Sequence, residues 1–514
     1  MTIAAELRRA ATKAGGVPYL VSGAEVVTYA EHWRRVRRFA DALAARGIGR
    51  GTRVAIWAAN DIPSATAMQA VVAAGATIIP LTTRLTCVET AQIIGQSGAE
   101  LIMAPETLLG RRYVDEAVEL CGREKVVCLE GTPPADVVSW RDLIQRGSAD
   151  ALEAVDLAEN GDESQIVVTQ FTSGTTGQPK GVQLRQGPMV ATARSWSRIV
   201  GLGYADVTPL LYPLSHVGGF KTGLTSSLVV RATVVLLPVV SVAATVEVLQ
   251  QHPVTVMNAP PAILRDLLDA HVSGTLTTPR SLRTIVTGSS VVPPRLVLDL
   301  KAQFGIADVI NAYGLTEASG VCSMTRRGDD IERVCHTLGR AIPGVEFRVA
   351  APNEGGIGEL EVSTPAVMVG YLGDDAATAA AVHDGWLRTG DTGWIDSAGY
   401  IHLAGRSSDV ILVGGYNVYP AEVEVALEKH PEVCEAAVVS APDERLGEVP
   451  VAFVVTRAGL AHSDLERWLS DRLANYKRPR RYWLVDALPR GELGKISKRL
   501  LRDRAESEGA GVPE

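Results

Sequence analysis

The strongest local signal for chemistry is a ten-residue stretch that combines small hydroxyl side chains, glycines and one lysine. It reads TSGTTGQPKG, and apolar runs on both sides predict a loop between two strands. Its glycines let the backbone approach a ligand closely, while its hydroxyls and its lysine suit a polyphosphate. The residues are Thr172, Ser173, Gly174, Thr175, Thr176, Gly177, Lys180 and Gly181. The spacing is not that of a P-loop, and on composition alone a solvated surface loop fits equally well.

A second candidate is the run YGLTE. Tyr313 beside Gly314 offers a flat face and room for a purine ring, and Thr316 can donate to a phosphate oxygen. Glu317 is a hard carboxylate of the kind that Mg²⁺ prefers when it also bridges phosphates. The alternative is structural, a turn followed by a helix with Thr316 as its N-cap.

Two single residues complete the set. Asp391, between Gly390 and Thr392 in an apparent turn, can accept hydrogen bonds from two ribose hydroxyls, although an Asx-turn is an equal alternative. Lys495 follows Gly494 in a polar loop and would by default be a surface lysine. However, a mobile ammonium in such a loop can also neutralise two anions that a reaction must bring together, which lowers the barrier to their approach.

The elements that must position these residues indicate an α/β fold. Helical patterns alternate with short apolar strands over the first 160 residues and beyond, which predicts mostly parallel sheets covered on both faces. After about residue 345, short strands with Gly, Pro and Asp turns predict a small antiparallel, β-barrel-like subdomain. A compact pattern of strands and helices follows Arg406. We therefore expect a large domain over residues 1–405 and a small mobile α+β domain over 406–514.

Bulk properties exclude several classes of protein. The 514-residue chain is 46% hydrophobic and 21% charged, and its net charge of -8 argues against nucleic acid as a main partner. The uncharged stretch Ile62–Thr83 contains Gly75 and Pro80, so it predicts a buried helix, a turn and a buried strand rather than a membrane span. Six cysteines without metal-site spacing, and no visible signal peptide, indicate free thiols in the cytoplasm. The excess of arginine over the nine lysines suggests a GC-rich bacterial gene.

Taken together, five motifs in order resemble those of the adenylate-forming superfamily, in its acyl-CoA synthetase branch. They are TSGTTGQPKG, NAYGLTEAS (Asn311–Ser319), RTGDTGWID (Arg388–Asp396), GRSSDVILVGGYNVYPAEVE (Gly405–Glu424) and LPRGELGKISKR (Leu488–Arg499). The similarity spans about residues 15 to 505. It implies binding of the ATP phosphates by the first motif, with Thr316 at the α-phosphate, Glu317 on Mg²⁺ and Lys495 as the catalytic lysine of adenylation.

The same resemblance implies further roles. Around adenine and ribose it places Gly288, Ser289, Ser290, Asn311, Tyr313, Gly314, Asp391 and Arg406. A CoA channel is implied at Gly414 and Gly415, just past a hinge. This chain departs from the family in these motifs: the hinge position is Ser408 rather than Lys or Asp, and Asn311 stands where Gln is frequent.

The segment PLSHVGGF, Pro213 to Phe220, resembles the family's acyl-binding segment. An aromatic commonly precedes its histidine, but here that position is Ser215, and Gly218 and Gly219 follow His216. Small residues predict an enlarged acyl site for a bulky alicyclic, terpenoid- or steroid-like or fatty acid. His216 is interpreted as pocket wall rather than general base.

These observations predict an ATP-dependent acyl-CoA ligase that consumes a carboxylic acid, ATP and CoA with Mg²⁺. The alternative acceptor is the arm of a carrier protein, and the outside alternative is a non-catalytic binding protein of the same fold. We expect no stable membrane insertion, and the option of a homodimer stays open.

Overall fold

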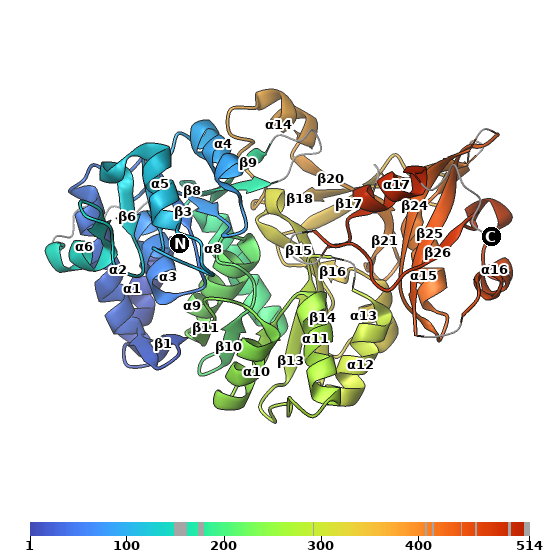
Figure 1. Cartoon of the computed structure of the whole chain (residues 1–514), viewed down its shortest axis with the longest axis horizontal. Helices are drawn as coiled ribbons and strands as arrows, with labels where there is room; N and C mark the ends of the chain where they lie inside the picture. Colours follow the sequence, from blue (N-terminus) through green and yellow to red (C-terminus); the bar gives the residue numbers. More distant parts are fainter. Residues whose placement is uncertain are drawn as a thin grey trace.

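The computed structural model describes residues 1–148, 162–172, 179–290, 292–406, 409–413, 416–443, 445–457, 460–491 and 495–507. Four sheets organise them into a larger N-terminal part and a smaller C-terminal part, which Figure 1 shows at the right in orange and red. The expected α/β fold is confirmed.

The first sheet has seven strands in the order β7-β6-β5-β3-β4-β8-β9, all parallel except the last pair. Their bounds are β3 (Arg53–Trp57), β4 (Thr77–Leu81), β5 (Leu101–Ala104), β6 (Val126–Cys128), β7 (Val138–Ser139), β8 (Ile166–Thr172) and β9 (Lys180–Arg185). The helices in this part of the chain are α2 (Tyr29–Ala44), α3 (Ile62–Ala73), α4 (Cys87–Ser97), α5 (Tyr113–Cys121) and α6 (Trp140–Arg146), with the turn η1 (Arg123–Lys125).

The second sheet has nine strands and includes the first two of the chain, so the N-terminal alternation divides between two sheets. Its order is β16 (Arg340–Ala341), β15 (Gly320–Met324), β14 (Asp308–Leu315), β13 (Thr284–Gly288), β12 (Val256–Asn258), β10 (Val207–Leu210), β11 (Thr233–Leu236), β1 (Pro18–Ser22) and β2 (Glu25–Thr28). Its helical elements are α1 (Ile3–Ala14), α8 (Gln186–Val200), η2 (Gly218–Thr225), α9 (Ser226–Val230), α10 (Val242–Gln251), α11 (Pro261–Val272), α12 (Pro294–Phe304), η3 (Thr316–Ala318) and α13 (Ile331–His336).

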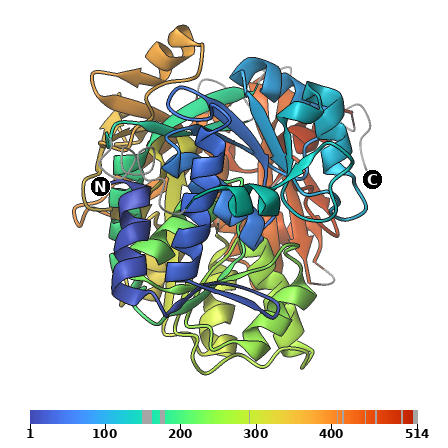
Figure 2. The same cartoon turned by 90° about the vertical axis from the view of Figure 1, so that its left-hand side faces the viewer.

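The uncharged stretch Ile62–Thr83 forms the predicted helix, turn and strand. All twelve residues of α3 are buried, Gly75 takes a positive φ of 85°, and β4 follows in the centre of the first sheet. A helix that is apolar all round belongs in a core, and α3 packs against both α1 and α2 there. Figure 2 shows the blue N-terminal helices across the front of the molecule. In the described residues, no helix is both long and apolar enough to cross a bilayer.

An antiparallel sheet and a mixed sheet, in which only β25 and β26 pair in parallel, make up the rest. The third comprises β17 (Glu346–Ala350), β18 (Gly358–Ser363), β19 (Val382–His383), β20 (Trp386–Ile395) and β21 (Ile401–Arg406), with α14 (Asp375–Ala381) beside it. The fourth comprises β22 (Ile411–Val413), β23 (Tyr416–Val418), β24 (Val433–Asp443), β25 (Gly447–Thr456) and β26 (Tyr482–Leu484), with α15 (Pro420–Glu428), α16 (His462–Ser470), η5 (Asn475–Lys477) and α17 (Lys498–Ser507).

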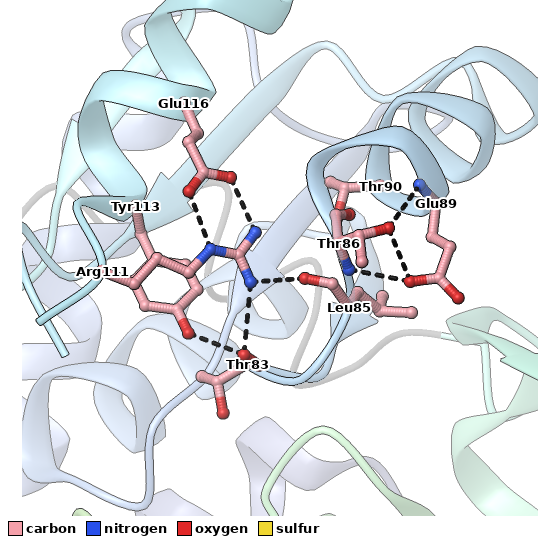
Figure 3. Close-up of polar contacts among 8 residues, drawn as sticks. All are labelled: Thr83, Leu85, Thr86, Glu89, Thr90, Arg111, Tyr113 and Glu116. Atoms are coloured by element: carbon pink, nitrogen blue, oxygen red, sulfur yellow. Dashed lines mark hydrogen bonds and ion pairs between the residues drawn. The ribbon is translucent and has the colours of Figure 1, made fainter. Parts of the chain in front are cut away.

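One arginine fixes the loop that leaves β4. The guanidinium of Arg111 donates two bonds of 2.7 Å to the Glu116 carboxylate and also bonds the carbonyl of Leu85 (Figure 3). The Tyr113 hydroxyl donates to the Thr83 carbonyl at 2.6 Å. Because β4 and β8 run parallel, this loop leaves the same sheet edge as the phosphate loop after Thr172, and its anchoring stiffens that edge.

Candidate active site

The candidate phosphate loop joins two antiparallel strands, as predicted. Thr172 ends β8 and lies opposite Lys180, the first residue of β9. The Lys180 ammonium lies 5.1 Å from the centroid of the Tyr371 ring, a cation–π distance. Ser173, Gly174, Thr175, Thr176 and Gly177 lie outside the described residues.

Tyr371 links this lysine to the candidate metal carboxylate. Its hydroxyl donates to Glu317 Oε1 at 3.0 Å, and the Met368 amide donates to the Glu317 carbonyl at 2.7 Å. Burial and the Glu317 charge raise the pKa of Tyr371, so its hydroxyl stays protonated as a donor. The sequence reasoning missed Tyr371 because it stands in no motif; it reaches the site through a bridge between Val182 and Tyr371.

The structure rejects one alternative for Thr316. It opens η3, a three-residue 3₁₀ turn whose N-cap position is Leu315, with no side-chain capping bond. Thr316 is therefore not a helix N-cap, and its proposed role toward the α-phosphate remains a prediction.

The described residues suit a magnesium that arrives with a nucleotide. They hold no group of three or more His, Cys, Asp or Glu side chains that could bind a metal ion alone. Mg²⁺ commonly binds through one or two carboxylates together with substrate phosphates, and Glu317 beside the base of the phosphate loop fits that mode.

The candidate adenine segments meet on neighbouring parallel strands. Gly288 ends β13 opposite Ala312 of β14, and a Cβ at Gly288 would lie 2.0 Å from the Ala312 carbonyl oxygen. A Cβ at Gly314 would lie 1.6 Å from the Gly320 carbonyl oxygen, so glycine is required where β14 meets β15. Asn311 is buried, and its side-chain amide donates to the Thr337 carbonyl at 3.0 Å, which gives it a structural bond.

Tyr313 and the candidate ribose carboxylate are in direct contact. The Tyr313 hydroxyl donates to Asp391 Oδ2 at 2.5 Å. The apparent turn around Asp391 was a wrong prediction, because Asp391 lies inside the ten-residue strand β20, paired on both edges by β18 and β21. Asp391 is the register partner of Arg406, so the strands bring these two positions together; the Arg406 side chain lies outside the description.

The candidate acyl segment runs into η2. Ser215 is buried, and desolvation followed by the positive charge of Lys495 lowers the pKa of His216 to about 4. The imidazole is therefore neutral near pH 7, which agrees with a wall rather than a proton-transfer role. The Tyr212 ring stacks beside His216, and its hydroxyl lies 3.4 Å from Ser289 Oγ, so the acyl segment adjoins the predicted Gly288–Ser290 wall at Ser289.

Close packing accounts for the two glycines after His216. A Cβ at Gly219 would lie 2.0 Å from the Pro213 carbonyl oxygen, and one at Gly218 would lie 3.1 Å from the Tyr212 ring. The space next to these glycines is thus filled by protein. Their contribution to an enlarged acyl site remains a prediction.

Lys495 is exposed, and its positive charge acts on the buried His216 ring although the two residues are far apart in the chain. A short hairpin carries it: the Gly491 amide donates to the Lys495 carbonyl at 2.7 Å, and the Ser497 amide donates to the Pro489 carbonyl at 2.8 Å. The charge of the candidate catalytic lysine therefore reaches the acyl segment.

A carboxylate holds this hairpin against the N-terminal part. Arg490 donates to both oxygens of Glu435 at 2.7 and 2.6 Å, and Arg265 of α11 pairs with the same carboxylate at 2.9 Å. Lys498 is half-buried and pairs with Glu424 at 2.7 Å. The candidate hinge Ser408 and the candidate CoA-channel residues Gly414 and Gly415 lie outside the described residues.

The chain matches two family models, an AMP-binding enzyme over residues 7–372 and an AMP-binding enzyme C-terminal domain over residues 422–495. It is 36% identical to 3-[(3aS,4S,7aS)-7a-methyl-1,5-dioxo-octahydro-1H-inden-4-yl]propanoyl:CoA ligase of Rhodococcus jostii, over 98% of each chain. Its fold matches the o-succinylbenzoate CoA synthetase of Bacillus subtilis in complex with its acyl-adenylate intermediate, with a TM-score of 0.81 and 28% identity. The match covers 97% of this chain and 98% of that one. ATP-bound MatB of Rhodopseudomonas palustris matches with a TM-score of 0.85, 27% identity and coverage of 98% and 99%.

Proposed function

Because this chain belongs to the AMP-binding enzyme family, we propose that it is an ATP-dependent, AMP-forming acid–thiol ligase. In the first step the acid carboxylate attacks the α-phosphorus of ATP, giving acyl-AMP and pyrophosphate. In the second, the CoA thiolate attacks the acyl carbon, giving acyl-CoA and AMP. The thiol proton passes to solvent.

The proximity of Lys495 to His216 carries the assignment of the first step. The acid carboxylate and the α-phosphate repel each other as they approach, and an ammonium between them offsets that repulsion. A lysine on a hairpin braced by Glu435 reaches this place from outside the N-terminal part. We assign adenylation to Lys495, with Thr316 donating to the α-phosphate.

The proposed nucleotide site is built on two hydrogen-bonded pairs, Tyr313 with Asp391 and Tyr371 with Glu317. Asp391, oriented by the Tyr313 hydroxyl, would accept from the ribose, with Tyr313 itself beside the adenine. Lys180 and the loop after Thr172 would hold the phosphates. Glu317, oriented by Tyr371, would hold Mg²⁺, which neutralises phosphate charge when it is bound.

For the second step we propose that the part after residue 405 rotates about Ser408, removes Lys495 and presents Gly414 and Gly415 to CoA. This proposal includes a domain boundary between residues 405 and 406. β21 ends at Arg406 in the third sheet and β22 begins at Ile411 in the fourth, which supports a boundary between them.

We propose that the substrate is a bulky, alicyclic acid, as the name of the Rhodococcus relative indicates for that enzyme. Transfer to a carrier-protein arm is the alternative second step, and thioester formation with free CoA separates the two. We also propose a cytoplasmic location, which the six unpaired cysteines support. A homodimer is kept as a hypothesis, which sedimentation of the full chain tests.

The decisive experiment separates the half-reactions in Lys495→Ala. Acid-dependent pyrophosphate release should fall by at least about a hundredfold, while CoA capture of supplied acyl-AMP is largely kept. Lys301→Ala is the matched control, because Lys301 lies on the exposed side of α12 and bonds only the Ala307 carbonyl among the described residues. Equal loss of both steps would refute the assignment, and absence of acid-dependent pyrophosphate release by the wild type would refute the enzyme.

A further inference from the structure

A lysine that no motif uses is wholly buried next to the acyl segment. Lys221 lies in η2, its side chain has an exposed fraction of 0%, and its Nζ has no hydrogen-bond partner among the described residues. Burying an amine without a partner costs several kilocalories per mole, more when it is charged, and buried polar groups without partners are rare. The unpaired Lys221 amine next to the acyl segment therefore suggests that a ligand supplies its hydrogen-bond partner.

The amine faces the backbone of the β14–η3–β15 hairpin. A Cβ built at Gly320 would lie 3.0 Å from Lys221 Nζ and 3.6 Å from a methyl group of Val217. Gly320 has a φ of 97°, so it is a position where a side chain would be strained as well as crowded. The lysine therefore occupies the space that a side chain at residue 320 would need.

Lys221 also stands between two parts of the candidate site. His216, which feels the charge of Lys495, comes five residues earlier on one side. Glu317, the candidate metal carboxylate, comes three residues before Gly320 on the other. The η2 segment is a π-helix, a rare geometry that is often found at functional sites. Lys221 directly follows Pro213–Phe220, the segment proposed to line the acyl site, and is a buried amine beside it in the chain.

A purely structural role does not explain the amine. No ion pair reaches Lys221 within the described ranges, and the titratable group that acts on it is the Cys322 thiol, whose pKa burial raises to about 12 and which is therefore neutral. Burial lowers the pKa of Lys221 to about 7, so it is close to half neutral at physiological pH. A methionine would fill a similar volume without the cost of burying an amine.

We propose that Lys221 donates a hydrogen bond to a carbonyl oxygen on the acyl group, remote from the carboxylate that is activated. The proposal rests on the proposed acyl-CoA ligase function and adds the chemical class of its acid: a bulky acid with a ring ketone. A neutral ketone matches the site better than a second carboxylate, because it requires no buried counter-charge. Both the ammonium and the amine can donate to it.

The test compares two bicyclic propanoic acids, a perhydroindane derivative with ring ketones and its deoxo counterpart, in the wild type and Lys221→Met. For the wild type we expect a higher kcat/KM on the ketone acid. Lys221→Met should lose about 10- to 100-fold on the ketone acid and change the deoxo acid by less than about threefold, because only the former leaves an oxygen unpaired. Lys301→Met should leave both values unchanged.

If Lys221→Met folds poorly, Lys221→Gln provides a second measurement of the preference between the two acids. Its side-chain amide keeps a donor, so it should recover part of the preference for the ketone acid, whereas a structural role alone would move both acids together. Equal changes on both acids, or no change in Lys221→Met, would overturn the role of Lys221. A wild type that ligates the deoxo acid as well as the ketone acid also overturns it while sparing the proposed function, which fails only if no acid is activated.

Discussion

The contact between Arg265 and Glu435 gives a prediction about how Lys495 reaches its place. Glu435 lies under the Lys495 hairpin and is shared by Arg490 of that hairpin and Arg265 of α11, at 2.6 and 2.9 Å. The Glu435 side chain is 12% exposed and that of Arg265 is 37% exposed, so solvent screens the pair in part. Removing Arg265 should therefore weaken this orientation of the C-terminal part by at most about 1 kcal/mol.

A change of about 1 kcal/mol alters the ratio of two orientations about fivefold. For Arg265→Ala we expect acyl-AMP formation, followed as acid-dependent pyrophosphate release, to slow by about two- to fivefold. CoA capture of supplied acyl-AMP should not slow, since it needs the lysine withdrawn. Glu435→Gln, which removes both pairs, should have a larger effect of the same kind.

Arg295→Ala is the matched control, because Arg295 pairs with Asp299 on its own helix and does not contact the C-terminal part through that pair. The reasoning is refuted if Arg265→Ala slows both half-reactions equally, or if Arg295→Ala has the same effect. An unchanged rate of adenylation would show that the contact contributes nothing to the orientation of Lys495.

Two further predictions concern ATP binding and acid stability. Tyr371→Phe removes the donor to Glu317 and should raise the KM for MgATP by about tenfold, with a small change in melting temperature; an unchanged KM contradicts the link between Tyr371 and the metal carboxylate. His32 is wholly buried, bonds Gln69 at 2.5 Å, and has its pKa lowered to about 4 by burial. Because the unfolded state binds the proton first, stability present above pH 6.5 is lost as pH falls, by about 3 kcal/mol near pH 4. Between pH 7 and pH 4, the urea midpoint should fall less steeply in His32→Gln than in the wild type. His216 is present in both proteins and lowers the stability of both as the pH falls, so the difference between them reports His32.

The sequence predicted best where local pattern and environment agree. The uncharged run Ile62–Thr83 became α3, the turn at Gly75 and β4, because a helix without charged side chains can be buried on all sides, here against α1 and α2. The loop after Thr172 was placed between strands by the apolar runs that flank it. Both predictions used only neighbours in the chain.

Predictions failed where pairing with distant strands decides the backbone. The Gly-Asp-Thr-Gly run around Asp391 has turn composition, yet it lies within β20, where Asp391 pairs with Arg406 of β21. The pairing with β18 is irregular at this point, and Gly390 has a φ of 71°. Next to Gly218 and Gly219 the space is filled by Tyr212 and Pro213, which the sequence did not indicate; their contribution to an enlarged acyl site stays a prediction. Tyr371 gave no signal in its own segment. Lys221 did carry a sequence signal, because a lysine in a Gly-rich, largely apolar run is unusual, but no role was predicted from it.

The pairing of Asp391 with Arg406 has a mechanical consequence. If the C-terminal part turns about the chain just beyond Arg406, the axis of that motion passes one strand away from the carboxylate proposed to hold the ribose. Displacement in a rotation grows with distance from the axis. AMP bound at Asp391 would lie near the rotation axis and move little, while Lys495, farther from that axis, would be displaced from the site. The nucleotide can thus remain bound as one set of catalytic groups replaces another, and the acyl-adenylate need not be released between the two steps.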